Sequence, residues 1–106
     1  MHELKRAFLL SIEATFRAGL DLVKRKNADY AGDGDPFKNF RSAGVAGVSV
    51  ERAILVRVLD KLARISNLLD KPQAVVDEAL EDTILDAINY LAILKAYREQ
   101  EYGPRP

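Results

Sequence analysis

Two rows of polar side chains, each on an otherwise apolar segment, are the residues of this 106-residue chain best suited to chemistry. The first row, within RVLDKLARISNLL, consists of Arg57, Asp60, Arg64 and Asn67. The second row, within EALEDTILDAINY, consists of Glu78, Asp82, Asp86 and Asn89. Neighbours in each row are three or four residues apart, so each row lines one side of a helix. Charged groups beside an apolar face are costly unless they are paired or used, so we expect either ion pairs or a site.

A site for a phosphorylated nucleotide is the functional interpretation of the two rows. Mg²⁺ usually takes one or two carboxylates and completes its octahedron with water and phosphate oxygens. The candidate metal ligands are Asp60, Glu78, Asp82 and Asp86. Arginine binds phosphate in forked geometry, and lysine binds it as a point charge. The candidate ligand-binding residues on the two helices are Arg57, Lys61, Arg64, Asn67, Asn89 and Tyr90.

The same rows allow two other interpretations. If Asp60, Asp82 and Asp86 share a magnesium ion, a metal-bound water between them would be a nucleophile for phosphoanhydride hydrolysis. If the rows only pair with each other, the result is a set of interhelical ion pairs, each contributing about 0–1 kcal/mol when exposed. The expected pairs are then Arg64 with Glu78 or Asp82 and Arg57 with Asp86, while Lys61 is left to solvent.

Three long helices must position these rows. Apolar residues at helical spacing predict helices over residues 2–28, 50–70 and 76–100. Pro72 ends the second helix, because the residue before a proline is disfavoured in the helical region. Only a few residues separate the second helix from the third, so these two should pack antiparallel. We therefore expect an all-α fold, with three long helices in an antiparallel bundle, as a single domain over residues 1–106 with a frayed tail at 101–106.

A long loop, DYAGDGDPFKNFRSAGVAGVS, joins the first two helices and holds three aromatic side chains. Loops of this length in compact domains are often functional. Tyr30, Phe37 and Phe40 either anchor the loop on the helices or include a ring that stacks on a nucleobase. In the second case Asn39 and Arg41 would supply polar contacts, so all five are candidate ligand-binding residues.

Composition narrows the classes of function. The formal net charge is zero, which argues against a broad electrostatic grip on duplex nucleic acid. There is no cysteine, and the single histidine, His2, lies at the N-terminus, so any metal would be a hard cation such as Mg²⁺. The first residues carry charges within their apolar pattern, which predicts neither a signal peptide nor a membrane span. We expect a cytoplasmic protein without a membrane partner.

The first predicted helix is apolar on more than one side, since Leu9, Leu10 and Leu22 lie off its main row. Three helices of this size also leave little core per residue. We therefore expect a homo-oligomer, a dimer or higher, that covers the surplus apolar surface.

Three segments of the chain resemble the phage nucleotide-modification-associated domain family: KNADYAGDGDPFKNFR, LVRVLDKLARISNLL and DEALEDTILDAINYLAIL. Members of that family carry motifs similar to Y…PFxNF, R…DKxxRxxNLL and E…DTxxDxxNY, in that order along the chain. The resemblance covers residues 26–97 and implies a phage or prophage origin, hence the host cytoplasm, and a role near nucleotides. The matching positions are Tyr30, Pro36, Phe37, Asn39, Phe40, Arg57, Asp60, Lys61, Arg64, Asn67, Glu78, Asp82, Asp86, Asn89 and Tyr90.

The chain is more distantly similar to the all-α nucleoside triphosphate pyrophosphatases of the MazG-like and dimeric dUTPase group. That similarity implies helical oligomers in which ExxE on one helix and ExxD on the next hold magnesium. This chain departs from the pattern, because Asp60 is followed by Arg64 and Asn67, and Asn89 replaces a carboxylate. We therefore expect a protein that binds or sequesters a phosphorylated nucleotide, linear or cyclic, in a mixed Arg/Asp pocket between the second and third helices. The alternatives are a magnesium-dependent nucleotide pyrophosphohydrolase and a helical interaction module without a ligand.

Overall fold

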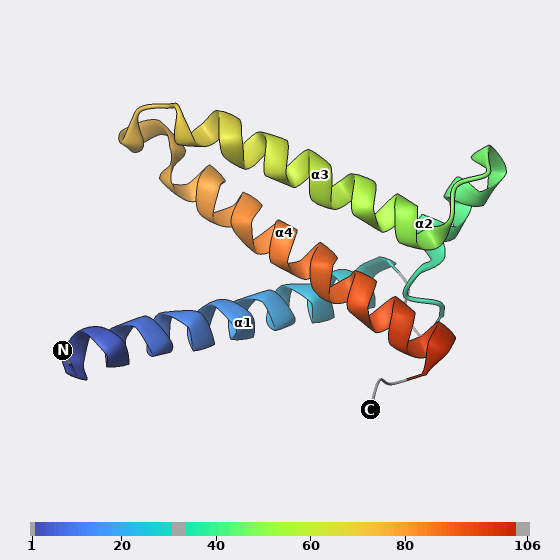
Figure 1. Ribbon diagram of the computed structural model, residues 1–106, viewed down its shortest axis with the longest axis horizontal. Coiled ribbons are helices and arrows are strands. Elements are labelled where there is room, and N and C mark those ends of the chain that lie inside the picture. The colour runs from blue at the N-terminus through green and yellow to red at the C-terminus, as the bar shows by residue number, and fades with distance from the viewer. Residues whose placement is uncertain (1, 31–33, 104–106) are drawn as a thin grey trace.

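The computed structural model describes residues 2–30 and 34–103, and for residues 29–30 and 73–77 it describes the backbone alone. In chain order its elements are α1 (His2–Tyr30), α2 (Lys38–Arg41), the 3-10 helix η1 (Ser42–Ala46), α3 (Val50–Leu69) and α4 (Gln73–Tyr102) (Figure 1). Every regular element over these residues is helical, which confirms the all-α class. In the same part of the chain, a search for a helix long and apolar enough to span a bilayer finds none.

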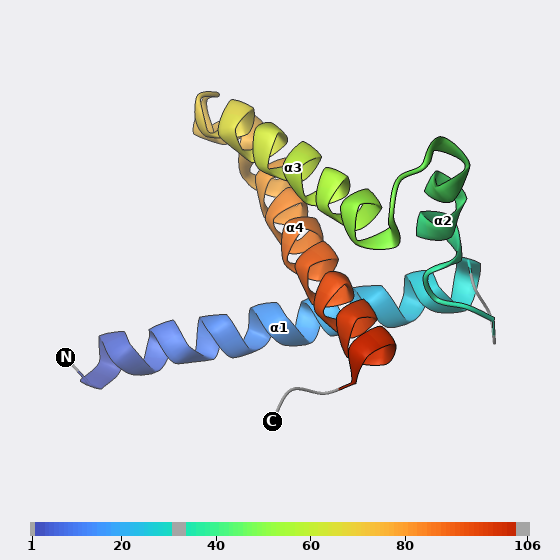
Figure 2. The ribbon, with the colours of Figure 1, turned by 45° about the vertical axis from the view of Figure 1, so that its right-hand side comes forward.

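The helices α3 and α4 form a hairpin in which the two run back alongside each other (Figures 1 and 2). Ser49 caps the start of α3, because its hydroxyl accepts a hydrogen bond of 3.1 Å from the Arg52 backbone N–H. Pro72 precedes α4 as its N-cap, where a proline costs no helical hydrogen bond. The side chains buried most deeply in the described part of the chain are Phe37, Ile54, Val58, Thr83 and Ala87.

The ends of α4 differ from the expectation by two or three residues. The helix begins at Gln73, directly after the proline cap, and not at residue 76. It continues through Tyr102, two residues into the tail that was expected to fray. A tertiary contact explains the extension, since the Tyr102 hydroxyl donates a hydrogen bond of 3.0 Å to Glu51 Oε1 on α3. The rest of the expected tail, residues 104–106, lies outside the described residues.

The helix α1 crosses the hairpin and, within the described residues, contacts only α4 of the other long helices. The approach is close at Gly19, where an added Cβ would lie 2.8 Å from Asn89 Oδ1. N-terminal to this crossing, α1 diverges from α4, as both views of the ribbon show (Figures 1 and 2). One copy of the chain therefore does not close the three-helix bundle that the sequence predicts.

The molecule is extended for its length. Its radius of gyration is 16.2 Å, whereas a compact chain of this size has about 13 Å. The diverging half of α1 accounts for this shape, since it projects away from the hairpin (Figure 2). An extended chain of this kind leaves apolar surface uncovered.

Candidate functional site

One member of the α4 row, Asp86, lies against Lys61, which stands on α3 beside the row of that helix. The distance from Lys61 Nζ to Asp86 Oδ2 is 3.1 Å. From α1, Lys26 Nζ lies 3.8 Å from the other oxygen, Oδ1, of the same carboxylate. Each long helix thus contributes one charged group to this cluster, which we name the lysine–aspartate junction. Its two ammonium groups and one carboxylate give it a net positive charge.

Helical periodicity explains why α3 and α4 place these groups at their shared edge. Lys61 stands three residues after the buried Val58, and Asp86 stands between the buried Thr83 and Ala87. Residues at these offsets lie on the border of the packed face, half-covered by the neighbouring helix. The side chains of Lys61 and Asp86 are accordingly 28% and 23% exposed. Their ion pair is therefore less screened by solvent than one on the open surface.

The polar row of α4 faces α1 as well as α3. Asn89 lies against α1, where its side-chain oxygen occupies the space that a Cβ on Gly19 would need. Asp86 is one turn earlier on the same side, which brings it to Lys26. The sequence predicts a pocket between the second and third helices, and the structure places residues of the first helix, Gly19 and Lys26, beside the same edge.

Arg64 lies near the junction on α3 and is held by a hydrogen bond to a buried hydroxyl. Its Nε donates to Thr83 Oγ1 at 3.3 Å, and that hydroxyl donates to the Ala79 backbone oxygen at 2.7 Å. Thr83 is 3% exposed, whereas Arg64 is exposed. This bond uses one of the five guanidinium N–H groups, so the rest of the fork can meet an anion.

The interhelical ion pairs predicted for Arg57 and Arg64 do not form among the side chains that the structure describes. Asp86 instead takes Lys61 and Lys26, and Arg64 takes a threonine hydroxyl. The expectation that Lys61 is left to solvent is therefore wrong. Lys61 leaves α3 closer to the packed face than Arg57 or Arg64, so its ammonium group is the one that meets Asp86.

The carboxylates proposed to hold magnesium are not brought together in one copy of the chain. The remaining members of the two rows are exposed, namely Arg57, Asp60, Asn67, Glu78 and Asp82. Over the described residues, no three carboxylate or histidine side chains lie close enough to share a metal ion. Asp86 also faces two ammonium groups, which would repel a cation. Over the described residues of one copy, the structure therefore does not bring Asp60, Asp82 and Asp86 together as one group of ligands.

An aromatic pair borders the junction. The ring of Phe40, in the short helix α2, packs edge-on against Tyr90 of α4, with centroids 6.2 Å apart and an interplanar angle of 85°. Tyr90 stands one turn after Asp86 on α4, so its ring and the charged cluster share one edge of the hairpin. Both rings are half-buried and keep part of their surface open. Asn39, beside Phe40, is exposed.

Phe37 anchors the loop segment and has no open face for a ligand. It is 3% exposed, and its ring packs edge-on against Tyr97 with centroids 5.2 Å apart. Its backbone N–H donates to Asp35 Oδ1 at 3.0 Å. The anchoring interpretation is therefore confirmed for Phe37, and its role as a stacking platform is wrong because the ring is covered. The side chain of Tyr30 lies outside the described residues.

Arg41 is bound by groups of the protein itself. It is hydrogen-bonded to Asp35, lies 4.0 Å from Glu101 Oε1, and sits over the ring of Tyr97 at 5.8 Å from the centroid. The bond from Arg41, and then the N–H of Phe37, hold the pKa of Asp35 below its ordinary value of 3.8. These contacts tie α2 to the end of α4. In this structure Arg41 is part of that attachment and not of the junction.

A second polar cluster closes the end of the hairpin where α3 begins and α4 ends. Glu51 accepts hydrogen bonds from Arg98 and from the Tyr102 hydroxyl. The bond from Arg98, and then that from Tyr102, lower the pKa of Glu51 from its ordinary 4.5. Arg98 also lies over the ring of Tyr102, 5.2 Å from its centroid. Sequence patterns do not predict this cluster, because about 50 residues separate Glu51 from its partners and their spacing carries no periodicity.

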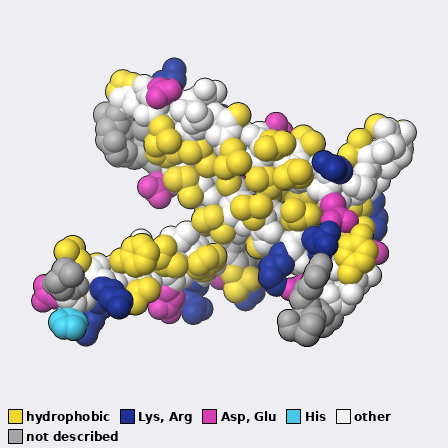
Figure 3. Space-filling model, viewed as in Figure 1, with side chains coloured by type: hydrophobic (Ala, Val, Ile, Leu, Met, Phe, Trp, Pro, Cys, Tyr) yellow, Lys and Arg dark blue, Asp and Glu magenta, His cyan; other side chains and the backbone are white. Residues whose placement is uncertain are grey.

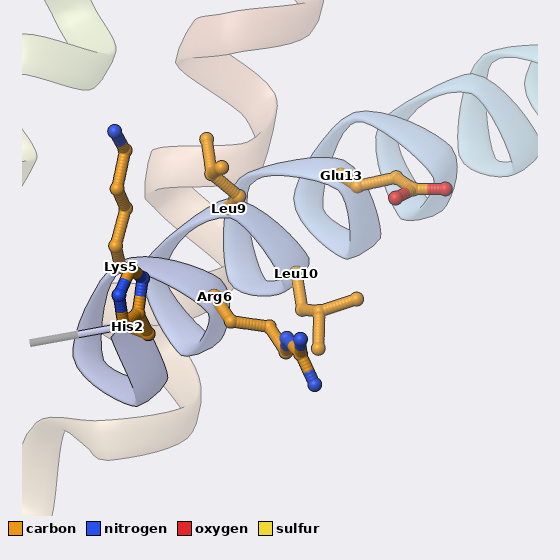
Figure 4. A pocket seen from close by; sticks show the side chains of 6 residues that line it. All are labelled: His2, Lys5, Arg6, Leu9, Leu10 and Glu13. Carbon is orange, nitrogen blue, oxygen red and sulfur yellow. The ribbon is translucent and has the colours of Figure 1, made fainter.

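A shallow hollow of about 310 Å³ lies at the free end of α1, far from the junction (Figure 4). Its walls come from this one helix and consist of His2, Lys5, Arg6, Leu9, Leu10 and Glu13. The side chains spread apart in Figure 4 and do not converge on a common point. The hollow contains none of the predicted site residues, and we assign no site to it.

Three residues in or next to the junction were not singled out from the sequence: Gly19, Lys26 and Thr83. Gly19 carried a usable signal, because a glycine inside an apolar helical pattern costs about 1 kcal/mol relative to alanine and usually has a packing reason. Lys26 carried none, since a lysine near the end of a helix is ordinarily solvated. Thr83 is recognisable only once its burial is known.

Comparisons with known proteins add no relative: no family model, curated protein or solved structure matches this chain. The two resemblances described above rest on the quoted motifs alone. The features of the structure that bear on function are therefore the side chains that the fold brings together. They are the lysine–aspartate junction, the arginines beside it on α3 and the aromatic pair of Phe40 and Tyr90.

Proposed function

We propose that this protein binds a phosphorylated nucleotide at the lysine–aspartate junction and leaves it chemically unchanged. The observation that carries the proposal is the meeting of Lys26, Lys61 and Asp86 from three different helices. One carboxylate holds two ammonium groups close together and cannot neutralise both. A partly buried site with surplus positive charge is suited to an anion such as phosphate.

The aromatic pair favours a nucleotide over a simple phosphate. Tyr90 lies about 6 Å along the helix axis from Asp86, so a base could lie against the rings of Tyr90 and Phe40 while its phosphate meets the lysines. The amide groups of Asn89 and Asn39 carry both donors and acceptors and suit the edge of a base.

Two arginines of α3, Arg57 and Arg64, lie on either side of Lys61 along the helix and add to the positive charge near the junction. Arg57 precedes Lys61 by four residues and Arg64 follows it by three, so all three lie along one side of the helix. Each guanidinium binds a phosphate in forked geometry. A row of three cations over two turns suits a ligand with more than one phosphate, either linear or cyclic.

Binding without turnover is favoured because no group of carboxylates is assembled for a metal ion in the described residues. In the phage setting that the resemblance implies, such a protein would sequester a nucleotide in the host cytoplasm. A magnesium-dependent pyrophosphohydrolase would instead need Asp60, Asp82 and Asp86 to move together around the ion. We also propose that the protein acts as a homo-oligomer, because one copy leaves much apolar surface uncovered.

A thermal-shift panel tests the proposal. It includes nucleoside mono-, di- and triphosphates and cyclic dinucleotides, each with Mg²⁺ and with a chelator. A ligand at about 100 times its dissociation constant should add roughly 2.7 kcal/mol to the free energy of unfolding. We expect at least one nucleotide to raise the melting temperature in the presence of the chelator, and mass spectrometry to recover it intact. A panel without any shift would indicate the interaction module, and conversion of the nucleotide would indicate the hydrolase; either result overturns the proposal.

A further inference from the structure

The N-terminal half of α1, residues 2–17, carries an apolar row that is left exposed by the part of the chain that the structure describes; we name this segment the arm. The row consists of Leu4, Phe8, Ile12 and Phe16, which are between 41% and 75% exposed. These residues recur every four positions and lie on the same side of α1 as Gly19, where the helix meets α4. The packed face of α1 therefore continues into solvent beyond the crossing.

The hairpin has a second uncovered apolar surface, which we name the hairpin face. It includes Leu59 and Leu62 of α3 with Ile84 and Leu91 of α4, between 36% and 55% exposed. Helical spacing places these residues on the edge of each helix opposite the lysine–aspartate junction. The crossing by α1 is on the junction side, so the hairpin face lies on the other side. Figure 3 shows apolar side chains gathered over α3 and α4, and apolar side chains along α1 in the same view.

The uncovered area matches what an obligate dimer buries. The chain exposes 8389 Å², whereas a compact monomer of 11.8 kDa exposes about 5,900 Å². The excess, roughly 2,500 Å², is at the upper end of the area that each partner loses in an obligate homodimer, about 1,000–2,500 Å². A second copy of this chain carries an arm and a hairpin face that could cover those of the first copy. An uncovered area of this size therefore favours a second copy as the partner.

We infer that two copies exchange arms, so that the arm of each copy packs on the hairpin face of the other. Apolar side chains of α1 and of the hairpin are visible on one face of the molecule (Figure 3), and a twofold axis parallel to that face would bring an arm onto the hairpin of the second copy. Their lengths agree, since the 16-residue arm is about 24 Å long and α3 about 30 Å. Each hairpin then lies between its own α1 and the arm of the second copy, so that four long helical segments pack together.

A complementation experiment distinguishes arm exchange from like-with-like contacts. One variant carries Phe8→Asp and Ile12→Asp in the arm, and the other carries Leu59→Asp and Leu62→Asp in the hairpin face. By light scattering at micromolar concentration we expect the unaltered chain to be a dimer and each variant a monomer. An equimolar mixture of the two variants should regain the dimer mass. In the mixed dimer, the unaltered arm of the second variant packs on the unaltered hairpin face of the first, so one of the two contacts is restored. The matched control, Leu10→Asp, lies off the apolar row of the arm and should remain dimeric.

Three results would overturn the inference: a monomeric unaltered chain, a dimer that survives in either variant, or a mixture that stays monomeric. Far-UV circular dichroism of each variant checks that its helices are formed. No nucleotide is present in these experiments, so their failure would leave the proposed function to be tested separately.

Cross-linking tests the same contact without altering the apolar residues. The chain has no cysteine, so single-cysteine variants react only at the chosen position. A short bismaleimide should join Lys5→Cys, on the apolar row of the arm, to Ser66→Cys, one turn after Leu62 on the hairpin face. The control Ala14→Cys lies on the opposite side of the arm and should give little cross-linking to Ser66→Cys. Equal cross-linking from both arm positions would contradict the inference.

Discussion

Asp86 decides what the lysine–aspartate junction can do. Its carboxylate lies between the ammonium groups of Lys61 and Lys26, so in one copy of the chain it positions two cations and is poorly placed to hold a third. Within the motif DTxxD, the sequence alone allows Asp86 to be either a metal ligand or the partner of lysine ammonium groups. The choice between the two depends on Lys26, which is 60 residues away in the chain.

The variant Asp86→Asn separates binding from metal-dependent hydrolysis. Loss of the carboxylate leaves two neighbouring ammonium groups without a counter-charge, so we expect the free energy of unfolding to fall by about 1 kcal/mol. The junction becomes more positive, so affinity for the nucleotide in chelator should be retained or increased. Calorimetric titration measures this affinity. If the variant loses affinity for the nucleotide and the unaltered chain needs Mg²⁺ to bind it, Asp86 is a metal ligand and our assignment is wrong.

The contact of α1 with α4 depends on a residue without a side chain. We expect Gly19→Leu to push α1 away from Asn89 and to lower the stability by about 1–3 kcal/mol, as overpacking commonly does. The matched control is Ala18→Leu, because Ala18 is exposed on the same turn. Chemical denaturation measures both variants. Equal stability of the two would show that α1 is not seated on α4 at this point.

The cluster of Glu51, Arg98 and Tyr102 makes the closed end of the hairpin sensitive to acid. The pKa of Glu51 in the folded chain is lower than 4.5, so its contribution to stability is complete above that pH and is lost as the pH falls through the folded value. We expect the melting temperature to decline below about pH 4.5, and Glu51→Gln to flatten that decline. Melting curves from about pH 3 to 6 measure it, with Glu81→Gln, an exposed carboxylate of α4, as the control. A Glu51→Gln variant with the same pH profile as the unaltered chain would contradict the assignment.

At the scale of the elements, the sequence predicts well where the long helices lie in the chain and poorly which helices pack against one another. The spacing of apolar residues predicts the positions of the three long helices, because each helix carries apolar residues along one side. It misplaces the ends of α4, because the proline cap at Pro72 and the contact of Tyr102 with Glu51 decide where that helix begins and ends. Periodicity gives the angle of a side chain around its helix but not which helix lies opposite. For this reason the row on α4 was expected to face α3 alone.

The same limit applies to the candidate site. The rows singled out Asp86, and the order of the helices predicted that α3 and α4 would place charged groups at a shared edge, as Lys61 and Asp86 are. The pairing of charges was not predictable, because the depth at which Lys61 and Arg64 leave α3 decides which of them reaches the carboxylate. Burial of Phe37 was one of two predicted outcomes, and its contact with Tyr97 decides between them.

For the whole molecule, arm exchange and the junction involve the two ends of one helix. The arm is the N-terminal half of α1, and Lys26 lies near its C-terminus. Packing of the arm on a second copy would hold α1 at a fixed angle to α4, and so keep Lys26 near Asp86. Dimerisation would then contribute to the affinity for the nucleotide without any contact between the ligand and the second copy.

This coupling predicts that the arm variant Phe8→Asp with Ile12→Asp binds the nucleotide several-fold more weakly than the unaltered chain. Titration at concentrations where the unaltered chain is dimeric measures the difference, with Leu10→Asp as the control. Wild-type affinity in a chain that light scattering shows to be monomeric would mean that the two features are independent.

The central claim is that Lys26 and Lys61 bind the phosphate of a nucleotide without a metal ion. Calorimetric titration, in chelator, of the nucleotide that gives the largest thermal shift into the Lys26→Gln and Lys61→Gln double variant tests it most directly. Each charge-assisted hydrogen bond contributes about 1.5–3 kcal/mol, so we expect affinity to fall by about 100-fold or more. Lys95→Gln, which removes an exposed ammonium paired with Glu99, should bind as the unaltered chain does. Equal affinity in the double variant and the unaltered chain would contradict the claim.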